Sequence, residues 1–427
     1  MAEVRPFKGI RYDSALGLGE VLCPPYDVIS KEQQRELHEV NKFNAIRLEF
    51  GLEAATDTSI DNRYTRAAST LEEWIKSGVL VAEEDECYYI LEEGFVHLGI
   101  TRNRTSIVAR VKVEEFDKRI VLPHEETSSA PKKDRMQILE ATQANLSPIM
   151  SIYRDHKQVV VGIIEEHKHN LPIVDVEYQD INIKLWPISD KGQIEQIAAG
   201  FIDNPIYLAD GHHRYETALK YSQESHLGEQ VRDFVMMSLI EIDDPGLLVL
   251  PYHRMLRDIA EKEQELLQLI QSSFVVVEDK SLNNSKESIE ELGVSLERSL
   301  SSKSDELQFS VIYDHGSRIT TFSMNVELDG SENSLEKCPT WILEQKVLRP
   351  LMGPLEVIVD QGKLHFSHDA TEVLAGVSSG QYSIGILLPS MPLQLFEEVV
   401  FSGERMPIKS TYFSPKLPTG VVINQLK

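Results

Sequence analysis

The segment 208–216, with the sequence LADGHHRYE, constrains the fold of this 427-residue chain more than any other part of it. An apolar run at 205–209 ends at Asp210-Gly211, and from Tyr215 onward apolar residues recur at the i, i+3, i+4 spacing of a helix. This pattern predicts a buried strand that turns sharply at the glycine into a helix. Such units belong to α/β folds, in which ligands bind beyond the carboxyl ends of strands.

The first turn of that helix carries two imidazoles and a guanidinium, from His212, His213 and Arg214. A helix N-terminus presents free backbone N–H groups and the positive end of the helix dipole, so it attracts anions. Basic side chains placed there strengthen the preference for phosphate. We therefore predict a phosphate site at Gly211 and the three residues after it. The alternative is an Asp-Gly turn whose histidines are only solvated.

The charge balance limits the partners of the chain. Its formal net charge is −25, whereas binding to DNA, RNA or an anionic membrane needs clustered lysine and arginine. A local basic site for one small phosphorylated ligand is compatible with an acidic protein. We expect a small molecule and a nucleotide as partners, with no nucleic acid and no membrane; the oligomeric state stays open.

Cysteine content and hydropathy favour a cytoplasmic location. The three cysteines, Cys23, Cys87 and Cys338, form no CxxC pair, so neither a disulfide framework nor a zinc site is expected. The first residues, MAEVRPFKGIRYD, lack the apolar region of a secretory signal. No apolar stretch approaches the roughly 18 residues that a membrane-spanning helix needs.

Three regions are predicted, in an α/β (mixed α+β) chain. Residues 1–150 hold a helix after a capping box and then antiparallel strands between 87 and 113, which together form a β-rich extension. Residues 151–260 alternate strand, helix and strand up to the LADGHHRYE segment and form the core. Residues 261–427 form a C-terminal α/β domain whose proline-containing tail docks on another part of the protein.

A second cluster of reactive residues lies in the loop His124-Glu125-Glu126-Thr127, which follows an apolar segment. Lys132 and Arg135 come shortly after it. Carboxylates bind Mg²⁺, cations hold phosphate and one glutamate can serve as a base, so the mixture suits phosphoryl transfer. The alternative is a solvated charged loop. Neither GxxxxGK[ST] nor GxGxxG occurs, so a P-loop and a dinucleotide fold lack motif support.

Two further segments have a similar composition. His253-Arg254 follows an apolar run at 247–250, and either binds an anion or pairs with an acid. The tail residues Lys409, Ser410, Thr411 and Lys416 either close over an anionic ligand or face water. The turn Pro24-Pro25-Tyr26-Asp27 is either a rigid turn that faces a ligand or a structural turn, and we interpret it as structural.

Five segments, in this order, resemble those of the uncharacterised prokaryotic domain-of-unknown-function family 1015. The likeness runs over nearly the whole chain. The chain has LPYHR where LPTHR is expected, and MPIKST where MPPKST or MPQKST is expected. The segments are CPPYDVIS, PHEETSSAPKKDR, LADGHHRYETAL, LPYHR and KSTYFSPKLPTG.

The region of about 180–225 also resembles the ParB/sulfiredoxin-like fold. In that fold the equivalent segment at a helix start holds nucleotide phosphates, which here implicates Gly211, His212, His213 and Arg214. The sulfiredoxin cysteine is replaced by His212, so sulfinic acid reduction is not expected. Free-serine kinases of this fold share a histidine-rich segment, and the resemblance implies a link to serine metabolism.

These observations favour a kinase that uses ATP or ADP with Mg²⁺ and transfers a phosphoryl group to a small hydroxylated metabolite, with free serine as the leading acceptor. The alternatives are a nucleotide-binding regulator or partition-type switch without catalysis, and a scaffold without a ligand. The predicted catalytic residues are Glu125, Asp210 and His213. The predicted Mg²⁺ ligands are Asp210 and Glu126. The residues predicted to bind phosphate and nucleotide are Gly211, His212, His213, Arg214, Lys132, Arg135, His253 and Arg254.

Overall fold

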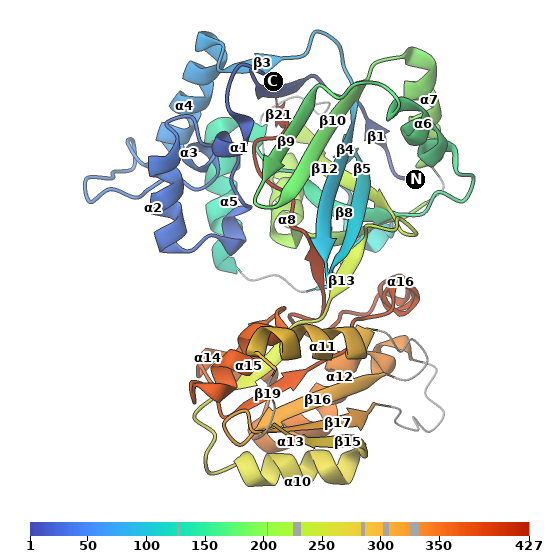
Figure 1. The fold of residues 1–427 in the computed structure, drawn as a ribbon. Helices are drawn as coiled ribbons and strands as arrows, with labels where there is room; N and C mark the ends of the chain where they lie inside the picture. The colour runs from blue at the N-terminus through green and yellow to red at the C-terminus, as the bar shows by residue number, and fades with distance from the viewer. Residues whose placement is uncertain are drawn as a thin grey trace. The chain divides into compact units, whose positions relative to one another are not determined.

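The chain forms two compact units in a computed structural model. Unit 1 comprises Met1–Leu247 and Pro415–Lys427, and unit 2 comprises Leu248–Ser414 (Figure 1). The structure describes residues 1–125, 129–202, 204–224, 232–282, 287–301, 307–324 and 333–426. In this part of the chain no helix has the length and apolar character that crossing a membrane requires.

Unit 1 is built on a large mixed sheet. Strands β6 and β11 lie at one edge and run parallel, with Ile206 opposite Val121. The hydrogen-bonded order is β6 (Val121–Leu122), β11 (Ile206–Asp210), β8 (Ile149–Tyr153), β12 (Phe234–Glu241), β5 (Ile100–Lys112), β4 (Tyr88–His97), β10 (Ile181–Ile188) and β9 (Val174–Tyr178), with β1 (Val4–Arg5) beside β5.

In the view of Figure 1, α2 to α5 lie to the left of this sheet, and α6 and α7 lie together to its right. A four-stranded sheet, in the order β3-β2-β21-β7, joins the two ends of the chain. The bounds are α1 (Leu18–Val21), α2 (Lys31–Val40), α3 (Ile46–Glu49), α4 (Arg63–Ser77), α5 (Ser129–Thr142), α6 (Val159–His167), α7 (Lys191–Gly200), α8 (His212–Glu224), β2 (Gly9–Tyr12), β3 (Leu80–Ala82), β7 (Ala144–Asn145) and β21 (Ile423–Gln425), with 3₁₀ turns at Tyr26–Val28 and Phe116–Lys118.

Unit 2 contains a six-stranded sheet with its own apolar core and a two-stranded ribbon of β13 and β20. The sheet order is β15 (Val275–Ser281), β17 (Arg318–Ser323), β16 (Gln308–Tyr313), β19 (Ile384–Leu387), β14 (His253–Leu256) and β18 (Leu364–Ser367). The other elements are β13 (Leu248–Leu250), β20 (Tyr412–Ser414), α10 (Glu263–Ser273), α11 (Ile289–Ser301), α12 (Pro339–Leu343), α13 (Arg349–Met352), α14 (Leu355–Asp360), α15 (Ala370–Ser378) and α16 (Leu393–Ser402), with a π-helical turn at Glu344–Leu348 and a 3₁₀ turn at Ser334–Lys337.

The predicted α/β class is confirmed, but the units differ from the three predicted regions. Residue 150 lies inside β8, which hydrogen-bonds to β11 on one side and β12 on the other. The strands between 88 and 112 lie in the middle of this same sheet rather than in an extension. Pairing between strands far apart in the sequence leaves no local change of composition, so the sequence does not show where this unit begins and ends.

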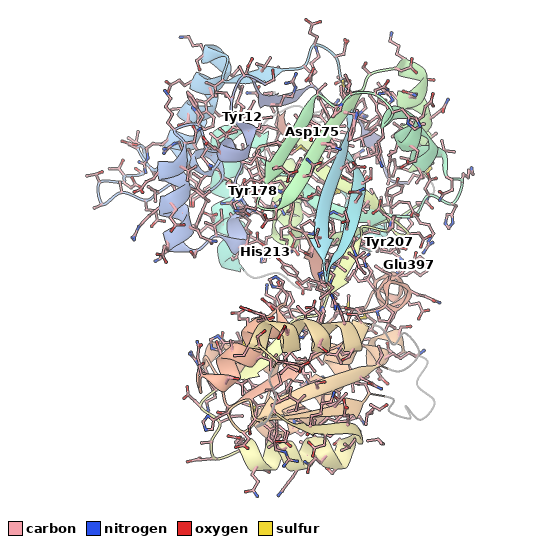
Figure 2. The ribbon with its side chains drawn as sticks, in the orientation of Figure 1. Tyr12, Asp175, Tyr178, Tyr207, His213 and Glu397 are labelled. Carbon is pink, nitrogen blue, oxygen red and sulfur yellow. The ribbon has the colours of Figure 1, made fainter. Side chains whose placement is uncertain are left out.

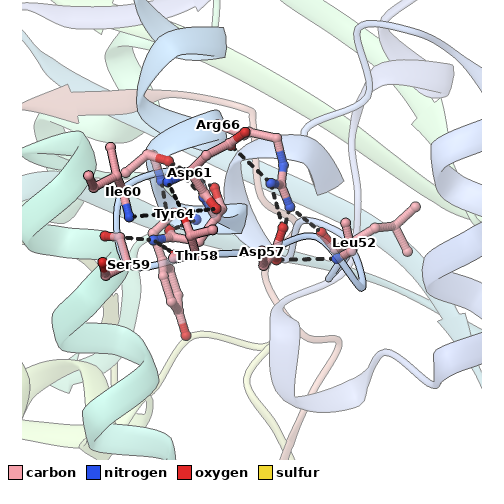
Figure 3. Close-up of polar contacts among 11 residues, drawn as sticks. Leu52, Asp57, Thr58, Ser59, Ile60, Asp61, Tyr64 and Arg66 are labelled. Atoms are coloured by element: carbon pink, nitrogen blue, oxygen red, sulfur yellow. Dashed lines mark hydrogen bonds and ion pairs between the residues drawn. The ribbon is translucent and has the colours of Figure 1, made fainter.

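Local hydrogen bonds define the start of α4, a helix that packs on α5. The Asn62 side chain accepts hydrogen bonds from the backbone N–H groups of Tyr64 and Thr65, and the Thr65 hydroxyl accepts from the Asn62 N–H, which completes a capping box. In the turn before it, the Thr58 hydroxyl accepts from the N–H of Asp61 at 3.0 Å (Figure 3). The helix then ends at Gly78, which has a left-handed conformation.

We predict that Asn62→Ala lowers the free energy of unfolding by about 1 kcal/mol, because two helix N–H groups lose their acceptor. Urea denaturation measures the change. Ser59→Ala is the matched control, since the described structure gives the Ser59 hydroxyl no hydrogen bond. Equal stabilities of the two variants would show that the cap contributes nothing.

Candidate functional site

The parallel pairing of β6 and β11 brings two of the predicted segments together. Parallel strands place their carboxyl ends at the same edge of a sheet. His124 follows β6, and Asp210 ends β11 immediately before α8. The backbone N–H of His124 donates to Nε2 of His212 at 3.3 Å, and the two rings meet edge to face with centroids 4.5 Å apart. The loop after β6 and the first turn of α8 therefore form one site.

The hydrogen bonds of this histidine pair define its tautomers. Nδ1 of His124 lies 2.7 Å from the Leu208 carbonyl and must donate to it, while Nε2 of His212 accepts a hydrogen bond from the backbone N–H of His124 and therefore carries no hydrogen. Burial lowers the pKa of His124, so the ring is neutral at pH 7. His212 is 7% exposed and its ring faces the loop after β6. Its predicted contact with phosphate stays a prediction, and its geometry supports a positioning role.

Gly211 forms the predicted sharp turn between strand and helix. Its φ is +92°, a conformation that residues with a side chain rarely adopt. A Cβ at this position would lie 2.8 Å from a terminal guanidinium nitrogen of Arg214. The arginine folds back over the glycine and donates to the Ser147 hydroxyl at 3.0 Å and to the Pro148 carbonyl at 2.8 Å.

Asp210 is held between two cations. Its Oδ1 lies 2.5 Å from Nζ of Lys416, and its Oδ2 lies 3.4 Å from Arg214. Burial by itself would raise the pKa of Asp210, but Lys416 and Arg214 outweigh it and lower the pKa to about 2. The carboxylate is thus ionised at neutral pH. Shortly after Lys416, strand β21 pairs with β2 and β7. This pairing holds the C-terminal segment in place, so Lys416 belongs to a structured tail.

His213, labelled in Figure 2, lies on the same turn of α8. It is more exposed than His212. Lys132 on α5 donates to Glu216 on α8 at 2.8 Å and lies close enough to His213 to act on it electrostatically. Partial burial lowers the pKa of His213; Glu216 opposes this effect and Lys132 adds to it. Glu125 also acts on His213, so the carboxylate and the imidazole lie in one electrostatic neighbourhood.

Arg135, on α5, lies in the interior of unit 1. It is 5% exposed, donates to the Glu49 carboxylate at 2.9 Å, pairs with Asp134 and lies 3.8 Å above the centre of the Tyr26 ring. Its predicted role on phosphate stays a prediction, and the contacts described here join Arg135 to neighbouring segments of unit 1. Arg135 and Arg214 both line a cavity of about 50 Å³ beside the first turns of α8.

No sequence pattern predicts the buried contacts of Arg135 and Arg214. Glu49, Ser147 and Tyr26 lie in segments without a motif for anion binding, and only folding brings them to the two arginines. The turn with Tyr26, interpreted as structural, has the arginine of the PHEETSSAPKKDR segment on its ring.

His253 and Arg254 belong to unit 2, where they begin β14. Both are 1% exposed. The Arg254 guanidinium donates to the carbonyls of Tyr252 and Lys409, and it lies 4.6 Å above the centre of the Phe366 ring. Their predicted phosphate contacts stay predictions; the buried guanidinium instead holds the chain around Lys409 in place.

The predicted tail residues are divided between the units. Lys409, Ser410 and Thr411 lie in unit 2, whereas Lys416 lies in unit 1. Ser410 is buried and its hydroxyl lies 2.8 Å from that of Thr340. Lys416 is the one that pairs with Asp210 at the α8 site in the described structure.

Of the two predicted Mg²⁺ ligands, Glu126 lies outside the described residues and Asp210 lies within them. Among those that are described, no group of three or more His, Cys, Asp or Glu side chains is arranged to hold a metal ion. Asp210 already has a cation on each carboxylate oxygen, so its geometry does not fit the predicted role of a Mg²⁺ ligand.

Residues 4–339 match the family described as "Protein of unknown function (DUF1015)". The chain belongs to this family. The match spans the CPPYD turn, the loop after β6, the α8 site and the His253-Arg254 segment. The tail with Lys416 lies beyond it, so the family match does not include the lysine that pairs with Asp210.

Solved structures give only distant likenesses. A free serine kinase in complex with AMP is 12% identical, with a TM-score of 0.35, over 74% of this chain and 91% of that one. A conserved hypothetical protein from Pyrococcus furiosus is 12% identical with a TM-score of 0.35, over 75% and 95%. SbnI from Staphylococcus aureus, truncated at its C-terminus, is 12% identical with a TM-score of 0.37, over 75% and 89%. Among curated proteins, none matches the chain.

We predict that Gly211→Ala lowers the free energy of unfolding by about 1–3 kcal/mol, because alanine is strained at a positive φ and its Cβ meets Arg214. Urea denaturation measures the loss. Gly162→Ala on α6 is the control: its Cβ meets nothing within 4 Å, and alanine should stabilise that helix by about 0.5–1 kcal/mol. Similar effects at both positions would contradict the strained turn.

The low pKa of Asp210 predicts a specific pH dependence of stability. A carboxyl group whose pKa is lower in the folded chain stabilises the fold above its unfolded pKa of about 4, and this stabilisation is lost as the pH falls through the folded value. The stability difference between the wild type and Asp210→Asn should be constant above about pH 4 and shrink towards pH 2. Urea denaturation across this range tests it.

The control for this titration is Asp85→Asn, which removes an exposed carboxylate of unit 1. A curve for Asp210→Asn that runs parallel to the control would mean that Lys416 and Arg214 do not hold the carboxylate in its charged form.

Proposed function

We propose that unit 1 binds a nucleoside di- or triphosphate, such as ADP or ATP, at the first turn of α8. One observation carries the proposal: Lys416, Arg214, Lys132 and His213 come from three separate segments to the N-terminal end of one helix. First-turn N–H groups have no carbonyl partner within the helix. A phosphate there would receive hydrogen bonds from the backbone and charge compensation from the side chains.

Lys416 is the side chain best suited to respond to the phosphate. Its ammonium group lies 2.5 Å from Oδ1 of Asp210, at the end of β11 and next to the first turn of α8. In the proposal the ammonium group contacts a phosphate oxygen while the ion pair with Asp210 is kept. In this proposal Asp210 holds Lys416 and Arg214 at the end of β11. This positioning role takes the place of the predicted role as a Mg²⁺ ligand.

We propose further that the site transfers the terminal phosphoryl group to a hydroxyl of a small metabolite. The acceptor oxygen forms a bond to phosphorus, the bond from phosphorus to the leaving phosphate oxygen breaks, and the hydroxyl proton passes to the carboxylate of Glu125. Glu125 suits this step because it directly follows His124, which is fixed to β11 and α8. Cations beside the phosphate offset the charge that spreads over its oxygens.

Mg²⁺ belongs to the proposal as the ion that accompanies nucleotide phosphates, which bind it together with one or two carboxylates and water. The described residues do not present such a carboxylate at Asp210, so we draw no step through the metal. The ParB/sulfiredoxin-like assignment of the core and free serine as the acceptor rest on the resemblance of the LADGHHRYE segment, and serine is the first acceptor to test.

The experiment is incubation of the full chain with a nucleotide panel and a pool of hydroxylated metabolites, followed by phosphorus NMR. A new phosphomonoester signal is expected. Glu125→Gln should keep nucleotide affinity and lose a factor of about 10²–10⁴ in turnover, because the base is removed. Glu140→Gln, an exposed carboxylate on α5, is the control and should leave both unchanged.

Two outcomes decide against a kinase. A variant Glu125→Gln with unchanged affinity, together with a wild type that forms no phosphomonoester, would favour a nucleotide-binding regulator. A nucleotide at 100 times its dissociation constant should add about 2.7 kcal/mol to stability. If no nucleotide changes the melting temperature, nucleotide binding itself is wrong and a scaffold is favoured.

A further inference from the structure

Strand β15 forms one edge of the six-stranded sheet of unit 2 and is open to solvent along its whole length. Strand β17 pairs with it on one side, and no described strand lies on the other. All of its residues are exposed, which holds for no other strand in the described part of the chain. An open edge presents unpaired N–H and C=O groups, and a strand of another chain can pair with them.

The first half of β15 is apolar. Val275, Val276 and Val277 are 72%, 48% and 46% exposed. The helix before them, α10, buries Leu266 and Ile270 in the core of unit 2 and leaves the valines uncovered. Proteins commonly protect an edge strand with charges or by covering it, because an exposed apolar edge pairs with other chains. The run of valines therefore indicates an edge that another strand covers.

The end of β15 shows which backbone groups face the open edge. The N–H of Leu282 donates to the carbonyl of Ser317, next to the start of β17, at 2.7 Å. The hydrogen-bonding groups of alternate residues point to the same side of an antiparallel strand, so those of Lys280 also face β17. The backbone groups of Asp279 and Ser281 therefore face the open edge, where an antiparallel neighbour can pair with them.

The charges of β15 complement a second copy of the same strand. Glu278 and Lys280 lie on one face of the strand, with their charged groups 3.0 Å apart. If two copies pair antiparallel about a two-fold axis at Asp279, Glu278 of each copy lies opposite Lys280 of the other copy. Opposite charges in such positions stabilise a sheet, and like charges destabilise it. An axis at Glu278 would set that carboxylate against itself, so the charges favour the axis at Asp279.

The residue at this axis has its charge compensated within each copy. The Asp279 carboxylate lies 2.5 Å from the guanidinium group of Arg318 and accepts a hydrogen bond from the Thr320 hydroxyl at 2.8 Å. Two such carboxylates can meet at the axis because each has a cation of its own. In the same register Val277 of one copy lies opposite Ser281 of the other, so the apolar half of each strand continues along the edge of its neighbour.

We propose that the chain forms a two-fold dimer in which β15 of one copy pairs antiparallel with β15 of a second copy, centred on Asp279. The sheets of the two copies of unit 2 then become one continuous sheet. The same surface is used by both copies, as in most dimers of identical chains. The dimer involves unit 2 and does not depend on the function proposed for the α8 site of unit 1.

Sedimentation equilibrium of the full chain at rising concentrations tests the dimer. We expect the mass to rise to twice that of the chain. Lys280→Glu should raise the dissociation constant of the dimer about tenfold or more, because it sets like charges opposite each other at two points. The double variant Glu278→Lys with Lys280→Glu restores opposite charges and should restore the dimer. A wild type that stays monomeric, which would leave the edge to a strand of another protein, overturns the proposal, and so does a Lys280→Glu dimer as tight as that of the wild type.

A cysteine at the axis tests the register independently. Asp279→Cys sets two thiols opposite each other in a hydrogen-bonded pair, whose Cα atoms are about 5.5 Å apart and so within the range of a disulfide. Mild oxidation should give a covalent dimer in electrophoresis without reductant, since the three native cysteines are buried. Val357→Cys, at an exposed position on α14, is the control and should stay monomeric. A lack of cross-linking at position 279, or equal cross-linking of both variants, contradicts the pairing.

Discussion

The paired charges of Asp210, Lys416 and Arg214 are the constraint on which the functional end of unit 1 depends. A buried carboxylate is stable only when cations and hydrogen bonds compensate its charge. Here the compensation joins the end of β11, the first turn of α8 and the C-terminal tail. The same three groups that stabilise the turn therefore set where positive charge faces an incoming anion, and the tail is part of the site because the carboxylate requires it.

Strand pairing explains how the remaining groups meet. The loop after β6 and the end of β11 are more than 80 residues apart in the chain, yet parallel pairing puts them at one edge of the sheet. Helix α5 then packs on α8 and brings Lys132 to Glu216, while Arg135 turns inward to Glu49. Helix α5 thus supplies a partly exposed cation, Lys132, and a buried one, Arg135. Which of the two is buried depends on the segments that pack around them.

The sequence by itself determined the local elements: the strand that ends at Asp210, the glycine turn, the helix after it and the α/β class. These follow from periodicity and from the φ that glycine alone adopts easily, both of which act over a few residues. It did not determine that His212 faces inward, that Arg135 pairs with Glu49 86 residues away, or that Lys416 reaches Asp210 from 206 residues away. Those outcomes belong to the tertiary structure, because the partner of a charge depends on which segments pack together, and no local pattern records that.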